Sequence, residues 1–130
     1  MDPLEFMRSR IGDFPEYADE ASRRLSDELV RAYLGEALTD MGERLSPLAE
    51  LLEAQLGDLL LRVGFSNARA YQAYERFART QTGPNGIVAS DTLLIELADR
   101  ARVLEAAILE TFLLDVAAAL DARDAAMLSA

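Results

Sequence analysis

Residues 90–127 read SDTLLIELADRARVLEAAILETFLLDVAAALDARDAAM and carry the strongest structural pattern in the chain. Apolar residues recur here at the three- and four-residue spacing of an α-helix rather than alternating as in a strand. Ser90 followed by Asp91 is typical of a helix start, because negative charge is stabilised near the positive end of the helix dipole. We therefore predict one helix from Ser90 to Met127, about 55 Å long at roughly 1.5 Å per residue.

The apolar face of this predicted helix is wide. Projection at about 100° per residue groups most of its large apolar side chains on one side. They are Leu94, Leu97, Ala101, Leu104, Ile108, Phe112, Val116, Ala119 and Leu120, with Ile95, Leu109 and Leu113 at the margins. Such a width indicates contact with more than one helix, so we predict that part of this face forms a homodimer interface. The predicted interface residues are Leu104, Ile108, Phe112, Val116 and Leu120.

The rest of the chain also divides into helices. A short helix or arm is predicted in residues 1–12, a long helix from Asp13 to about Leu45, and two shorter helices, Pro47–Val63 and Asn67–Thr82. The turn Gly83-Pro84-Asn85-Gly86 separates the last of these from the final helix. The sequence therefore predicts an all-α fold: a single helical-bundle domain over residues 1–130 with four main helices, two long and two short.

The unequal helix lengths raise the question of what covers the long helices. Either the two short helices stack end to end, or a second copy of the chain supplies the missing surface. The side of the last helix that carries Val103, Ala107, Leu114 and Ala118 is a second, weaker candidate interface.

The apolar stripe of the first long helix does not stay on one line. It begins as Tyr17, Ala18, Ala21, Leu25, Leu29 and Ala32, and it continues as Val30, Tyr33, Leu34, Ala37, Leu38 and Met41. The two stripes are offset by roughly a third of a turn. This helix is therefore expected to change partner or to bend near Gly35, unless Gly35 only allows a neighbouring helix to approach closely.

The composition excludes several classes of function. There is no Cys and no His, so thiol chemistry, the usual metal ligands and the usual catalytic triads are absent, and we do not expect an enzyme or a cofactor. The net charge of −10 disfavours binding to nucleic acid or to anionic lipid. No stretch is apolar enough for a signal sequence or a membrane span, so a cytoplasmic location is expected.

Two groups of residues are candidates for a binding site. Glu105 and Asp115 lie within the apolar arc of the last helix, where they could act as ligands or acid–base groups in the interior; salt bridges to arginines are the favoured interpretation. Arg69, Tyr71, Tyr74 and Arg76 could form a platform for an anion, although the tyrosines also fit a core stripe. Acidic runs such as Asp27-Glu28 are interpreted as solvated helix faces.

The leading hypothesis is a non-catalytic helical bundle that forms a homodimer and acts by binding another protein. The alternatives are a bundle that binds a small hydrophobic ligand or a carboxylate-ligated metal near Glu105 and Asp115, and an acidic mimic of nucleic acid that blocks a basic partner.

Overall fold

The computed structural model describes residues 2–65 and 86–128, and every regular element within them is helical. The elements are α1 (Pro3–Arg10), α2 (Glu20–Arg44), α3 (Glu50–Gly64), α5 (Ile87–Ala101), a short 3₁₀ turn η1 (Ala106–Ile108) and α6 (Leu109–Leu128). The predicted all-α bundle is confirmed, whereas the predicted helix over 67–82 lies outside the described residues. No helix in the described ranges is both long and apolar enough to cross a membrane.

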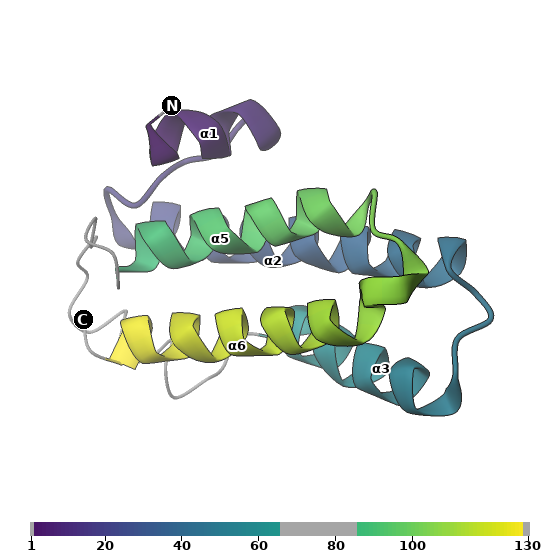
Figure 1. Ribbon diagram of the computed structural model, residues 1–130. Helices are drawn as coiled ribbons and strands as arrows, with labels where there is room; N and C mark the ends of the chain where they lie inside the picture. Colours follow the sequence, from purple (N-terminus) through teal and green to yellow (C-terminus); the bar gives the residue numbers. More distant parts are fainter. Residues whose placement is uncertain (1, 66–85, 129–130) are drawn as a thin grey trace.

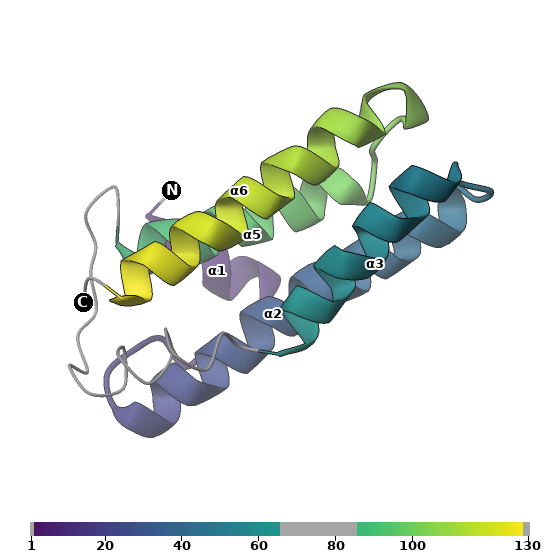
Figure 2. The same cartoon turned by 90° about the horizontal axis from the view of Figure 1, so that it is seen from below.

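The bundle consists of two packed helix pairs (Figures 1 and 2). Helix α2 packs against α5 and α3, and α6 completes the arrangement by packing against the same two helices. Helix α3 runs along only the C-terminal part of α2, while α1 lies on the outside of α5 (Figures 1 and 2). The centre of the core is filled by large side chains with almost no exposed surface, such as Leu34, Leu38, Leu94, Ile95 and Phe112.

The last third of the chain is a hairpin, so the prediction of one helix from Ser90 to Met127 is wrong. Helix α5 ends at Ala101, and the chain turns back through η1 into α6 (Figure 1). A straight helix of that length would extend beyond α2, which has 25 residues, and would leave much of its apolar face in water. The hairpin brings both halves onto one core, which explains the width of the projected face.

Arg44, at the end of α2, holds the hairpin turn in place. Its Nη2 donates to the carbonyl oxygen of Ala101 at 2.9 Å, and its Nη1 donates to that of Leu104 at 2.8 Å. Ala101 is the last residue of α5, where the intrahelical hydrogen bonds run out, and Leu104 lies in the turn that follows. The guanidinium therefore caps α5 from a neighbouring helix, a contact between residues nearly sixty positions apart.

Helix α2 begins later than predicted, at Glu20 rather than near Asp13. Asp19 is the N-cap, and its side chain accepts a hydrogen bond from the backbone N–H of Ser22 at 2.7 Å. The preceding loop keeps Phe14 and Tyr17 buried, with their rings in edge-to-face contact at 5.7 Å between centroids. Packing of these two rings takes precedence over the capping signal that Asp13 carries.

The buried face of α2 is a single stripe that runs the whole length of the helix. It consists of Arg23, Ser26, Asp27, Val30, Leu34, Ala37, Leu38 and Met41. The first half of the predicted stripe is wrong, because Leu25 is exposed and polar residues take the core positions there. The offset between the two predicted stripes is therefore explained by polar residues that face the interior.

Close contact between α2 and α3 depends on two glycines one heptad apart. A Cβ atom at Gly42 would lie 2.7 Å from Cδ2 of Leu56, and one at Gly35 would lie 3.3 Å from Cγ2 of Val63. The helix runs through Gly35 without interruption, so of the interpretations offered by the sequence the close approach is the one that holds. The pairing of positions 35 with 63 and 42 with 56 makes the two helices antiparallel.

We predict that alanine has opposite effects at Gly42 and at Gly57, which lies in α3 at a position where an added Cβ would meet no atom within 4 Å. Gly57→Ala should raise the free energy of unfolding by about 0.5–1 kcal/mol through helix propensity. Gly42→Ala should give no gain or a loss, because Leu56 must leave its rotamer at a cost of roughly 0.5–1.5 kcal/mol. Urea denaturation of both variants tests this, and equal stabilisation would contradict the close contact.

Candidate functional site

A buried polar network crosses the otherwise apolar core between α2, α5 and α6. At its centre Arg123 of α6 donates from Nε to Oδ1 of Asp91 at 2.5 Å and from Nη2 to Oδ1 of Asp27 at 2.7 Å. The hydroxyl of Tyr17 donates to Oδ2 of Asp91 at 2.7 Å. Each of these four residues is at most 5% exposed. We refer to them as the Arg123 network.

Arg31 extends the network to the end of α3. Its Nη2 donates to Oδ2 of Asp27 at 2.9 Å, and its Nη1 donates to the backbone carbonyl of Val63 at 3.1 Å. Asp27 therefore accepts hydrogen bonds from two guanidinium groups, those of Arg31 and Arg123. Together these contacts connect α2, α3, α5 and α6 with the loop that carries Tyr17.

The loop before α2 is held in an uncommon conformation by the same region. Glu16 has a φ of 62°, in the left-handed region that residues other than Gly rarely adopt. Its carbonyl accepts a hydrogen bond from Oγ of Ser26 at 2.5 Å, and the carbonyl of Tyr17 accepts one from Nη1 of Arg23 at 3.2 Å. These bonds from α2 fix the loop so that the Tyr17 hydroxyl reaches Asp91.

Burial and charge pairing have opposite effects on the pKa values of Asp91 and Arg123, and burial prevails only at Asp91. Burial raises the pKa of Asp91, because the charged carboxylate loses its solvation, and the nearby Arg123 only partly opposes this effect. Burial alone would lower the pKa of Arg123, but the charges of Asp91 and Asp27 raise it above its ordinary value. Arg123 is therefore a permanent cation. Asp91 has no exposed surface, and its carboxylate oxygens contact Arg123 and Tyr17 inside the bundle.

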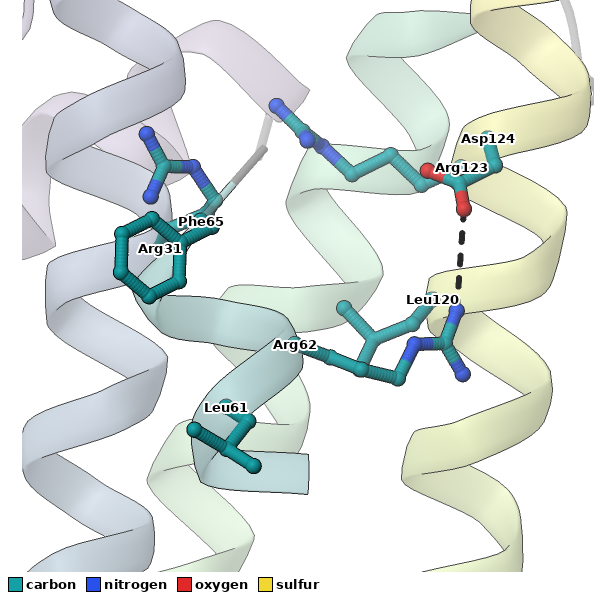
Figure 3. A pocket seen from close by; sticks show the side chains of 7 residues that line it. All are labelled: Arg31, Leu61, Arg62, Phe65, Leu120, Arg123 and Asp124. Carbon is teal, nitrogen blue, oxygen red and sulfur yellow. Dashed lines mark ion pairs between the residues drawn. The ribbon is translucent and has the colours of Figure 1, made fainter. Parts of the chain in front are cut away.

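A pocket of about 320 Å³ lies beside the network, where α3 ends. It is lined by Arg31, Leu61, Arg62, Phe65, Leu120, Arg123 and Asp124. Figure 3 shows Arg123 reaching from α6 toward Arg31 of α2, with Arg62 and Asp124 paired on the other side. The pocket combines three guanidinium groups with apolar walls, and Arg123 connects it directly to the buried charges.

The predicted interior site at Glu105 and Asp115 is wrong. Both side chains are exposed: Glu105 lies in the hairpin turn, and Asp115 lies on the outer face of α6 with Arg100 at 4.0 Å. The helical projection of residues 90–127 placed Glu105 and Asp115 in one apolar arc, because it treated α5, the turn and α6 as a single helix. The salt-bridge interpretation holds for Asp115. The other candidates, Arg69, Tyr71, Tyr74 and Arg76, lie outside the described residues.

The predicted interface residues are mostly interior. Leu104, Phe112, Val116 and Leu120 are buried within this single chain, so they are not free to contact a second copy. Ile108 is 52% exposed, at the hairpin turn. The prediction of an interface is corrected at the four buried positions, because the hairpin itself covers them.

The interpretation of Asp27 as part of a solvated face is also wrong, and the sequence contained a signal. Asp27 lies three and seven residues before Val30 and Leu34, in register with the core stripe, and four residues before Arg31. A carboxylate on a core line with an arginine one turn away indicates a buried pair. Nothing comparable marks Arg123 or Tyr17, whose partners lie far away in the sequence.

The two alternative functions receive little support from the geometry. Within residues 2–65 and 86–128 there is no group of three or more acidic side chains that could hold a metal ion. Many of the carboxylates are paired with arginines, among them Asp27, Asp40, Asp91, Asp99, Asp121 and Asp124. A mimic of nucleic acid would need them unpaired and aligned.

Comparison with known proteins finds no match to any family model, any curated protein or any solved structure. What can be inferred about function therefore rests on the residues of this chain and their contacts.

Proposed function

We propose that this protein is a non-catalytic helical bundle that works through protein–protein interaction and forms a homodimer through the outer face of α3. The observation that carries the proposal is the exposure of three large apolar side chains on that face. Leu51 is 64% exposed, Leu61 is 66% exposed, and Phe65, directly after the helix, is 76% exposed. Side chains of this size at regular spacing on one helix are typical of an interaction surface.

The exposed residues of α3 form a coiled-coil-like stripe. Leu51, Ala54, Asp58, Leu61 and Phe65 are separated by three, four, three and four residues, and all are exposed. We call them the outer stripe of α3. On the opposite side Leu56, Leu59 and Val63 are buried against the bundle. A helix that is apolar on both faces is typically covered on both, and no described part of the chain covers the outer one.

A second copy of the chain fits the outer stripe by charge. Helix α3 begins with Glu50 and Glu53 and has its one basic residue, Arg62, near its end, where it also pairs with Asp121 and Asp124 of α6. When two copies pack antiparallel, the acidic start of each helix lies beside the basic end of the other, as an isologous dimer requires. Asp58, at the middle of the stripe, then faces its own counterpart. This repulsion weakens the dimer without preventing it.

The test is the oligomeric state measured by light scattering over a range of protein concentrations. We expect a monomer–dimer equilibrium with a Kd on the order of 10–100 µM, since only a few large side chains are buried. Leu61→Glu should raise the Kd at least about tenfold, because it places two carboxylates in the interface, one from each copy.

Leu93→Glu is the matched control, since Leu93 is 41% exposed and lies on α5, outside the outer stripe of α3. It should leave the Kd within about twofold. Asp58→Ala should lower the Kd, because it removes the facing carboxylates at the centre of the dimer. A strict monomer at about 1 mM, or equal effects of Leu61→Glu and Leu93→Glu, would overturn the proposal.

A further inference from the structure

The pocket at the end of α3 contains hydrogen-bond donors that the described protein does not use. Arg123 is buried, and its Nε and Nη2 donate to Asp91 and Asp27. Its Nη1 makes no hydrogen bond to any residue in the described ranges, although the side chain lines the pocket. Because Nη1 has no acceptor among the described residues, an acceptor that enters the pocket can receive a hydrogen bond from it.

Two further arginines lie around the same space. Arg31 is held in a fixed orientation by Asp27 and by the carbonyl of Val63, which leaves part of its guanidinium fork for another acceptor. Arg62 enters from α3 and pairs with Asp121 at 2.9 Å and Asp124 at 3.7 Å. Three guanidinium groups from three helices therefore border one pocket (Figure 3). Guanidinium groups match the geometry of a carboxylate, which accepts two parallel hydrogen bonds.

The pocket also has apolar lining. Among the described lining residues Leu61, Phe65 and Leu120 are apolar, the first two of them also members of the outer stripe, and Asp124 is the one acidic side chain. The volume of about 320 Å³ lies at the small end of the range for ligand pockets. A ligand that matches this lining has a polar head and a short apolar tail or ring. The aromatic ring of Phe65 and the two leucines would cover such a tail.

The charge around the pocket selects the type of anion. Asp27 and Asp91 already neutralise Arg31 and Arg123, and the carboxylate of Asp124 lines the pocket directly. A phosphate with two negative charges would be repelled by Asp124, whereas a single carboxylate gains the unused donors at a smaller electrostatic cost. We infer that this pocket binds a small monocarboxylate with an apolar group.

The experiment is a titration of ¹⁵N-labelled protein with benzoate, followed by amide and arginine Nε chemical shifts. Benzamide, which is neutral and similar in shape, and inorganic phosphate serve as comparison ligands. The titration is done on the wild-type protein and on Leu51→Glu, because Leu51 belongs to the outer stripe but not to the pocket. If the protein does not dimerise, benzoate should still bind to both proteins, so a negative result for the dimer can be told apart from a negative result for the pocket.

We expect benzoate to saturate with a Kd of about 1 mM or below in both proteins, as its small size allows, and to shift the Nε signals of Arg31 and Arg62. Benzamide and phosphate should bind at least about fivefold more weakly. Arg62→Gln should weaken benzoate binding at least about fivefold, while Arg24→Gln, an exposed arginine on α2 outside the pocket, should not change it. No saturable shift, equal binding of benzamide, tighter binding of phosphate, or equal effects of the two variants would overturn the inference.

Discussion

Arg123→Met is expected to lower the free energy of unfolding by about 3–5 kcal/mol, the typical cost of removing one partner from a buried ion pair. The variant leaves Oδ1 of Asp27 and Oδ1 of Asp91 without the guanidinium that now lies between them. Asp27 keeps the guanidinium of Arg31, but Asp91 keeps only the uncharged hydroxyl of Tyr17, so its buried carboxylate loses its cationic partner. A loss of this size is a large fraction of the roughly 5–15 kcal/mol that stabilises a typical domain.

The matched control for Arg123→Met is Arg24→Met, which removes an exposed ion pair between Arg24 and Glu20 on one face of α2. Such pairs contribute about 0–1 kcal/mol. Adding Asp91→Leu to Arg123→Met should recover part of the loss, because it removes a carboxylate that has lost its partner. Urea denaturation gives all three values. Similar stabilities for Arg123→Met and Arg24→Met would show that the network is not a buried centre of the fold.

Phe112→Ala is expected to lower the free energy of unfolding by about 3–5 kcal/mol, because it empties a site at the centre of the core. The ring of Phe112 is 1% exposed, and the guanidinium carbon of Arg100 lies 5.4 Å from its centroid. Ile108, four residues earlier, belongs to the same stripe in the sequence but is largely exposed at the hairpin turn. Ile108→Ala should therefore change the stability by no more than about 0.5 kcal/mol.

The contrast between Phe112→Ala and Ile108→Ala also separates a core from a dimer interface. If Phe112 packs within its own chain, the difference in stability between the two variants is the same at low and at high protein concentration. If Phe112 instead lay in an interface between copies, Ile108→Ala would keep that ring and Phe112→Ala would lose it. Dimer formation would then stabilise Ile108→Ala more, and the difference between the two variants would grow with protein concentration. Denaturation curves at two protein concentrations decide between these outcomes.

Local signals in the sequence correctly predicted helical secondary structure in the described part of the chain. The helical spacing of apolar residues identified helices in the segments that contain α1, α2, α3, α5 and α6, and the absence of alternation excluded strands in the described part. These are properties of neighbouring residues, so they can be recognised without knowing the fold. The same reasoning identified Gly35 as a position where a second helix could come close, which the contact with Val63 bears out.

The candidate site could be predicted only in part, because its members come together from distant parts of the chain. Asp27 and Arg31 are one turn apart and could have been recognised as a buried pair. Arg123 and Asp91 are 32 residues apart, and Tyr17 and Asp91 are 74 apart. No local pattern relates such residues, since their contacts arise only when the hairpin of α5 and α6 closes on α2.

Spacing and composition were enough to establish that the chain forms helices with strongly apolar faces, because both act within a few residues. The direction in which those faces point depended on contacts between helices. The segment between Ser90 and Met127 bends into a hairpin, since one straight helix would have left apolar surface in water, and Arg44 satisfies the carbonyls at the bend. That bend placed Phe112 in the core and Glu105 and Asp115 in solvent, and it left the outer stripe of α3 as the surface where a partner is expected.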